Sequence, residues 1–257
     1  MARGTGKGCE QGSAQPRSQV RAVAEPFASI AIEQLFHVGT LNPADKGKTG
    51  YARSWEGHGL SVSPCPAAWE RIARLGGNPW FALDCADSHF LDVNALSADE
   101  RQQVADWAVA NGFARLEPCF TVSHFAEEVD DDVTTSFASR RDAIEEAVEV
   151  FAIDHSGVPS LRQLADMVER EETLVSEASL DALIGFKGGA GCFDFCLIAY
   201  VQTELSELDG LYWYADYGYL SAPRAVILPS RLDRWTRRQL DDQERSELEE
   251  IGDDAFG

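Results

Sequence analysis

Two short segments near the start of the chain carry the side chains best suited to hold a ligand. In the first, His37 stands at the end of a short apolar run and is followed by Gly39 and Thr40. A histidine at a strand end can hold a ribose hydroxyl, and a glycine close behind it lets the ligand approach the backbone. A histidine that only caps a turn is the alternative interpretation.

The second segment places two serines at alternate positions of a short strand. It reads Glu56-Gly57-His58-Gly59-Leu60-Ser61-Val62-Ser63. Because strand side chains alternate between two faces, Ser61 and Ser63 face the same way. Two hydroxyls on one face are costly inside a core unless they are hydrogen bonded, so this face is expected to line a cleft. A solvent-facing edge strand explains the pattern equally well.

The elements that must position these residues are strands early and late in the chain, with helices between them. The apolar patterns predict strands over 31–38, 59–63, 80–83, 89–93, 113–125, 211–214 and 225–228, and helices over 67–75, 97–111, 139–152, 160–168 and 193–208. The segment 193–208 is also compatible with a strand, because it is partly aromatic and β-branched. This order indicates an α+β fold rather than a doubly wound parallel sheet.

The composition changes along the chain and suggests its organisation. Residues 1–28 have little to bury and are expected to form a disordered tail. Residues 29–235 are expected to form a single α+β domain whose middle region, 138–208, is helical. Residues 236–257 are strongly acidic and are expected to form a helical tail.

Charge and composition exclude several classes of protein. The chain has 257 residues, 44% of them hydrophobic, and a net charge of −21, so it is neither disordered throughout nor collagen-like. This charge makes nucleic acid an improbable partner. No apolar run is long enough to cross a bilayer, so no membrane partner is expected. Six cysteines without a secretory leader indicate reduced thiols and a cytoplasmic protein.

Taken together and in this order, the two segments resemble the ADP-ribosyltransferase fold. The matching stretches are Leu35-Phe36-His37-Val38-Gly39-Thr40 and Gly57-His58-Gly59-Leu60-Ser61-Val62-Ser63, followed by the helix over 67–75. Late in the chain, Asp209-Gly210-Leu211-Tyr212-Trp213 and Ser221-Ala222-Pro223-Arg224-Ala225-Val226-Ile227 look like the closing strands of the same fold. The resemblance implies split antiparallel sheets with a helical insertion.

The resemblance also implies a function, namely an enzyme that uses NAD+ as substrate to modify a macromolecular target, expected to be a protein. Such proteins often act as toxins or phage-host effectors. His37 would hold the nicotinamide-side ribose, and Gly39 would offer its backbone to the carboxamide. Ser61 stands where many relatives carry a tyrosine that stacks on nicotinamide, so Tyr51 or Trp55 in the preceding loop is expected to supply that ring.

The catalytic carboxylate is where the sequence departs from the family. Breaking the bond between nicotinamide and ribose builds positive charge on the ribose, which a nearby carboxylate stabilises. Relatives often place a glutamate at the start of a late strand, but the region 221–223 holds no acid. The nearest preceding acid, Asp216, is therefore the candidate, and an ordinary turn aspartate is the alternative.

Two other functions remain open from the sequence. The missing late glutamate suggests a catalytically inactive member that binds a nucleotide or a protein. The net charge of −21 suggests an acidic inhibitor that mimics a polyanion. No metal site is expected, since Asp84, Asp87 and His89 are read as solvated loop residues rather than as ligands for a divalent cation.

Overall fold

The computed structural model describes residues 27–42, 55–126, 131–154, 157–185, 189–217 and 220–256. The fold is α+β, as the sequence predicts, with three sheets among the described residues. The expected tail over 1–28 lies almost wholly outside these residues, and so does Tyr51.

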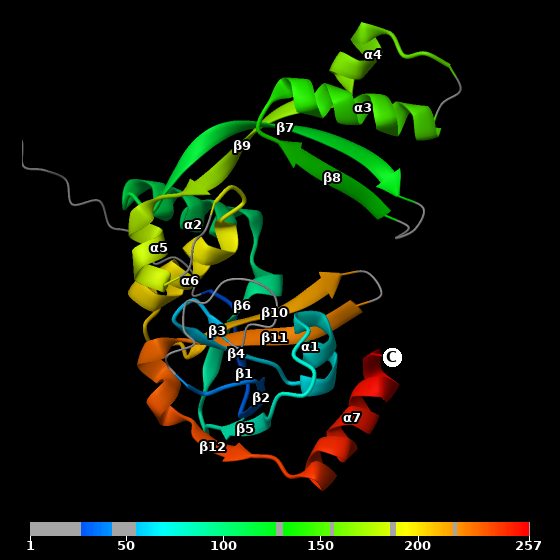
Figure 1. Ribbon diagram of the computed structural model, residues 1–257. Coiled ribbons are helices and arrows are strands. Elements are labelled where there is room, and N and C mark those ends of the chain that lie inside the picture. Colours follow the sequence, from blue (N-terminus) through cyan, green and yellow to red (C-terminus); the bar gives the residue numbers. More distant parts are fainter. Residues whose placement is uncertain are drawn as a thin grey trace, which may run out of the picture.

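The largest sheet has six strands in the order β1-β6-β10-β11-β4-β3 (Figure 1). Its neighbouring strands pair antiparallel, except that β10 runs parallel to β6. The strands are β1 (Ser29–Ala31), β3 (Trp55–Glu56), β4 (Gly59–Val62), β6 (His89–Asp92), β10 (Gly210–Tyr217) and β11 (Leu220–Ile227).

A second sheet has three antiparallel strands in the order β12-β5-β2. These are β2 (Gln34–Val38), β5 (Trp80–Asp84) and β12 (Thr236–Gln239). Leu35 and Leu83 of this sheet pack with Leu60, Phe90 and Ile227 of the first sheet in one apolar cluster. The two sheets therefore share a core, and burial of this apolar surface holds them together.

Helices cover the opposite face of the first sheet. Alternation along β6 turns Phe90 toward the second sheet and Leu91 toward α2 (Ala98–Ala110), α5 (Ala178–Ile184) and α6 (Phe193–Glu204). The segment 193–208 is thus a helix in its larger part. A short η2 (Val93–Ala95) follows β6, and η3 (Pro229–Arg234) follows β11.

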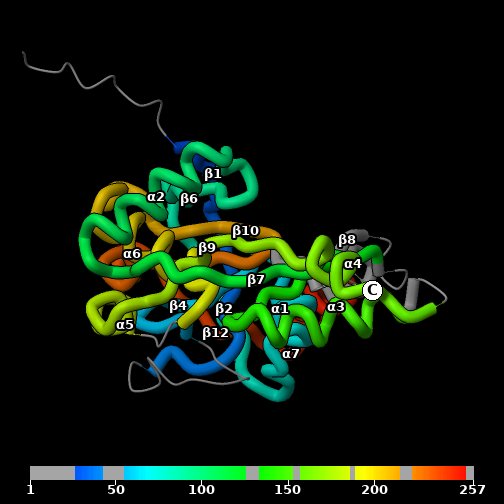
Figure 2. Tube along the Cα trace, turned by 90° about the horizontal axis from the view of Figure 1, so that it is seen from above, coloured from blue at the N-terminus to red at the C-terminus, as the bar shows by residue number. Residues whose placement is uncertain are grey.

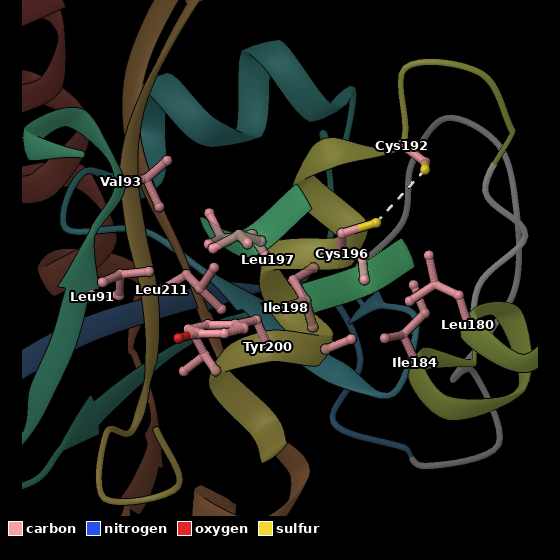
Figure 3. Packing of buried hydrophobic residues seen from close by; sticks show 14 of the residues in the cluster. Leu91, Val93, Leu180, Ile184, Cys192, Cys196, Leu197, Ile198, Tyr200 and Leu211 are labelled. Carbon is pink, nitrogen blue, oxygen red and sulfur yellow. Dashed lines mark hydrogen bonds between the residues drawn. The ribbon is translucent and has the colours of Figure 1, made fainter. Parts of the chain in front are cut away.

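Figure 3 shows this helical core with its two buried thiols, Cys192 and Cys196. Their sulfur atoms lie 3.7 Å apart at the start of α6. The hydrogen bond between them lowers the pKa of Cys192 and raises the pKa of Cys196, since the shared proton favours one thiolate over the other. The five described cysteines are free thiols.

The third sheet forms an arm that extends from the rest of the molecule (Figure 1). It has the order β8-β7-β9, from β7 (Ala114–Ala126), β8 (Asp131–Phe137) and β9 (Val168–Ser176). Helices α3 (Arg140–Asp154) and α4 (Leu161–Asp166) pack on one face through Ala143, Ala147 and Leu164. Seen from above in Figure 2, these two helices lie at the opposite end of the molecule from α5 and α6.

Two further helices pack against each other beside the second sheet. They are α1 (Pro66–Ala73) and α7 (Asp242–Phe256). Arg245 of α7 donates to Glu70 of α1 at 3.0 Å, and its guanidinium lies over the Trp80 ring. A Cβ at Gly252 would meet Ala67 at 2.6 Å, so this glycine lets the two helices approach closely.

Two of the differences between the structure and the sequence-based expectations concern the middle region and the end of the chain. The middle region 138–208 is not wholly helical, because Val168, expected at the end of a helix, begins strand β9. The segment after residue 235 is not only a helix, since Thr236–Gln239 pairs with β5 before α7 begins. In both cases pairing with a neighbouring strand overrides a local pattern that is polar or helical.

The helices of the described residues were also compared with the requirements of a bilayer. None of them combines the length and the apolar composition that a transmembrane span needs.

Gly210, where β10 begins, has no room for a side chain. A Cβ there would lie 1.8 Å from the Val226 carbonyl oxygen and 3.1 Å from the Phe90 ring. We expect Gly210→Ala to lower the free energy of unfolding by about 3 kcal/mol or more, because backbone on β11 must move. Urea unfolding measures this, with Gly76→Ala as the control, since nothing lies within 4 Å of a Cβ at Gly76. Equal destabilisation by the two substitutions would contradict this packing.

Candidate functional site

The two segments that carry the candidate residues meet where the two sheets join. Phe36 of β2 and Ser63, which follows β4, exchange two backbone hydrogen bonds of 2.8 Å. This isolated bridge is the point at which the edge of the second sheet touches the first. It brings His37 beside the strand that carries Ser61.

His37 lies inside this junction rather than at its surface. Its side chain has no exposed surface. Its Nδ1 lies 2.7 Å from the Ser61 carbonyl oxygen, and its Nε2 lies 3.2 Å from the Thr40 carbonyl oxygen. Trp55 Nε1 donates to that same Thr40 oxygen at 3.0 Å. His37 therefore ties β2 to β4 and to the chain that leaves β2.

The protonation state of His37 follows from its burial. Burial lowers the pKa of His37, and the hydrogen bonds to Ser61 and Thr40, which favour the charged form, only partly offset this. The imidazole is thus neutral near pH 7. Because a carbonyl oxygen only accepts, the shorter contact assigns the proton to Nδ1, which donates to Ser61.

The two serines have different environments although they share a face. Ser63 is completely buried, and its hydroxyl donates to the Pro223 carbonyl at 2.5 Å and accepts from the Cys65 N–H at 2.9 Å. It therefore joins the end of β4 to β11. Ser61 is also buried, but its hydroxyl has no hydrogen-bond partner among the described residues. Of the two, Ser61 is the side chain left to bind something else.

Gly39 and Thr40 are the two residues that directly follow strand β2. Gly39 has a φ of 127°, a conformation that favours glycine, and its N–H donates to the Pro79 carbonyl at 3.0 Å. The N–H is thus engaged within the protein, and the carbonyl is the backbone group left to face a ligand. The Thr40 hydroxyl accepts from the Asn42 N–H at 3.0 Å.

Asp216 is not brought to the serines. It pairs with Ser221 on β11, whereas Ser61 pairs with Val226, five positions farther along. At roughly 3.3 Å per residue these levels are about 16 Å apart along the sheet. Its side chain, like that of Ser221, lies outside what the structure describes.

An ion pair that the sequence analysis missed lies beside Ser61. Glu56 Oε1 accepts from Arg224 Nη1 at 3.0 Å, and the two side chains are 16% and 15% exposed. The pairs Glu56↔Gly59, Ser61↔Val226 and Arg224↔Trp213 place all of these side chains on one face. The residues Glu56 and Arg224 are therefore diagonal neighbours of Ser61 in the sheet, a relation in which Cβ atoms are about 7 Å apart.

Two indole rings complete this group. The Arg224 guanidinium lies 4.1 Å from the centre of the Trp213 ring on β10 and 5.7 Å from that of Trp69 on α1. We call these five residues, Glu56, Ser61, Trp69, Trp213 and Arg224, the Arg224 cluster. No sequence pattern identifies it, because Glu56 and Arg224 are 168 positions apart.

A shallow depression elsewhere in the molecule is a weaker candidate. It has a volume of about 570 Å³ and is lined by Glu33, Gln34, Asp84, Cys85 and Arg234, among others. Its polar groups largely bond one another, since Gln34 donates to Asp84 at 2.8 Å. Asp84 is thus engaged there, and the described residues include no group of three or more His, Cys, Asp or Glu that could hold a metal.

Comparisons with other proteins add no family to this description. The chain matches no protein-family model, no curated protein and no solved structure. The argument for function therefore rests on the residues of the junction and of the Arg224 cluster.

The neutral state of His37 makes stability depend on pH in a defined direction. His37 in the unfolded chain has a pKa near 6.5 and takes up a proton more readily than the buried His37 of the folded state. The stabilisation that comes from the neutral, buried imidazole is therefore fully present above pH 6.5. It is lost as the pH falls from 6.5 toward the lower pKa of folded His37. We expect His37→Asn, which keeps a donor for Ser61, to reduce the slope by up to about 1.4 kcal/mol per pH unit.

Urea unfolding of the two proteins at several pH values between about 8 and 5 measures this slope. Identical slopes for the wild type and for His37→Asn would show that burial does not lower the pKa of His37, contrary to the assignment above.

Proposed function

We propose that this chain is an ADP-ribosyltransferase-like enzyme that takes NAD+ as substrate and modifies a macromolecular target. The observation that carries the proposal is the junction itself. The two segments that suggested a dinucleotide site lie far apart in the sequence, yet Phe36 pairs with Ser63 and His37 bonds Ser61. The split into two sheets that meet there, with an inserted arm, also supports it.

The chemistry of the proposal sets clear demands on the site. The bond between ribose C1′ and the nicotinamide nitrogen breaks, and its electron pair leaves with nicotinamide. An acceptor nucleophile then attacks C1′ and loses its proton. Because positive charge develops on the ribose in the transition state, a fixed carboxylate close to C1′ lowers the barrier.

Glu56 is the carboxylate that we assign to this role in place of Asp216. It lies on the face of Ser61, and the bond to Arg224 fixes its position. Among the described residues, its second oxygen receives no hydrogen bond, so it is available to a ribose hydroxyl. Asp216 is about five residues distant along the sheet, too far to act on the same atom.

His37 acts in this proposal as a positioning residue. It has no exposed surface, so a ribose hydroxyl does not reach it without a rearrangement. Its bond to the Ser61 carbonyl instead fixes β4, and with it the Ser61 hydroxyl, relative to β2. Gly39, at the end of β2, is buried and Thr40 is partly buried, so their contact with the nicotinamide half is a prediction that needs a local rearrangement. The stacking role expected of Tyr51 lies outside the described residues.

A second candidate function is an inactive member of the same class that binds a nucleotide or a protein without turnover. The observation in its favour is that Arg224, not an acid, faces Ser63 across β11 and β4. Calorimetry with NAD+ combined with an assay for free nicotinamide separates the two, since the inactive member binds NAD+ and releases no nicotinamide.

The acidic inhibitor is less well supported. Such a protein needs its acids in one band, facing a basic partner. The exposed acids here include Asp106 on α2, Glu145 on α3, Glu171 on β9 and Glu250 on α7, which lie on different sides of the molecule (Figure 1). The exposed acids are therefore not confined to one band, since they occur on the arm, on α2 and on α7.

Replacement of the carboxylates tests the proposed function. We expect Glu56→Gln to reduce nicotinamide release from NAD+ at least about 100-fold, because the charge that stabilises the developing cation is lost. Asp216→Asn is expected to retain most of the activity. Release is followed with NAD+ labelled in the nicotinamide ring, in the presence of a cell lysate that supplies acceptors.

Glu149→Gln on α3 is the matched control for a lost surface carboxylate, since Glu149 is exposed on the arm. If the wild type releases no nicotinamide from NAD+ in the presence of the lysate, the enzyme assignment is wrong. If Asp216→Asn is inactive and Glu56→Gln is not, the assignment of the carboxylate is wrong.

A further inference from the structure

Arg224 is held in one orientation by three contacts. The central carbon of the guanidinium lies 4.1 Å from the centre of the Trp213 ring and 5.7 Å from that of the Trp69 ring. Its Nη1 donates a hydrogen bond to the Glu56 carboxylate. A guanidinium has five N–H donors in a rigid plane, so a single carboxylate contact leaves most of them unused. The contacts thus fix the direction in which the remaining donors point.

Three polar atoms of the Arg224 cluster are buried without a partner among the described residues. They are Arg224 Nε, Trp69 Nε1 and the Ser61 hydroxyl oxygen. The large majority of buried polar side-chain atoms in proteins are hydrogen bonded, because a buried donor or acceptor without a partner is destabilising. Two of the three can only donate, and the third can donate as well. Such a concentration of donors around one side chain indicates a missing acceptor.

We propose that the Arg224 cluster binds the phosphate oxygens of the substrate, which for a dinucleotide are those of its diphosphate. A phosphate group offers several acceptors and needs no donor, and its geometry matches the fork formed by Nε and a terminal nitrogen of arginine. The indole N–H and the serine hydroxyl add donors. The exposed 15% of the Arg224 side chain gives the anion a point of entry.

Glu56 has a distinct part in this site. In the absence of an anion it neutralises the guanidinium, which would otherwise lie buried without a counter-charge. When a phosphate binds, two anionic groups share one arginine, so Glu56 opposes the ligand. Removal of the Glu56 charge is therefore expected to tighten anion binding, whereas removal of Arg224 is expected to abolish it.

An ordered water is the alternative occupant. A buried water makes two to four hydrogen bonds and would satisfy these donors without any ligand. In that case neither substitution changes anion binding, because there is none at this site.

Calorimetry with inorganic pyrophosphate separates the two occupants. We expect the wild type to bind pyrophosphate, Arg224→Met to weaken binding at least tenfold, and Glu56→Gln to strengthen it several-fold. Arg141→Met is the matched control, since Arg141 makes an exposed ion pair with Glu145 on the arm. Failure of the wild type to bind, or equal affinity in all four proteins, overturns the proposal.

Two further measurements guard against a folding defect in Arg224→Met. Arg224→Lys keeps the charge and loses the fork, and is expected to weaken pyrophosphate binding several-fold. Ser61→Ala removes one donor with little change of volume and is expected to do the same. Wild-type affinity in both variants, with a native circular dichroism spectrum, contradicts the proposal.

The inference rests on the proposed function only for the identity of the ligand. Pyrophosphate has no ribose and no nicotinamide, so its binding is independent of transferase chemistry. If pyrophosphate binds through Arg224 but NAD+ is not turned over, the phosphate site stands and the proposed function fails. If NAD+ is turned over and Arg224→Met keeps the KM of the wild type, the function stands and the phosphate site fails.

Discussion

The contact between β2 and β4 is the constraint on which the site depends. Two backbone hydrogen bonds between Phe36 and Ser63 join the second sheet to the first, and the buried His37 imidazole adds a third link through Ser61. Most of the remaining contact between the two sheets is side-chain packing, which is not directional. The link therefore determines where the Ser61 hydroxyl lies relative to the end of β2. A neutral histidine suits this position, since a charged one would have to lose its hydration on burial.

The Arg224 cluster has an energetic feature that packing alone does not explain. Replacing a buried ion pair by apolar side chains of similar volume is often neutral or stabilising, so the pair is weak evidence for a structural role. Here the pair is largely but not completely buried, and three unsatisfied donors accompany it. Sites that bind ligands keep such groups because the ligand satisfies them. The same arrangement allows Glu56 to form an ion pair with Arg224 in the free protein and to face the ribose during the proposed reaction.

The sequence was sufficient for many of the elements and for the two segments that meet at the junction. The cap Ser97 with Glu100, and the cap Ser160 with Gln163, both form as the spacing predicts, because capping is a local interaction. Strand β9 could not be predicted in the same way. Its sequence is rich in Glu and Arg, and it becomes a strand because β7 offers it a partner.

The catalytic carboxylate shows the same limit. Asp216 was chosen because it is the acid nearest in sequence to the expected position, but strand register, which depends on pairing over long range, separates it from Ser61. Glu56 directly precedes the stretch Gly57–Ser63 that carries the resemblance, and the sequence gives it no role. Its partner Arg224 stands on β11, so only the assembled sheet shows that the two meet.

Hydrogen–deuterium exchange of the wild-type protein with and without NAD+ tests the central claim most directly, since it reports where the dinucleotide binds without requiring turnover. The account predicts slower exchange in the peptides that contain the end of β2, strands β3 and β4, and the neighbouring part of β11. Unchanged exchange throughout the chain, or protection confined to the arm formed by β7, β8 and β9, would contradict it.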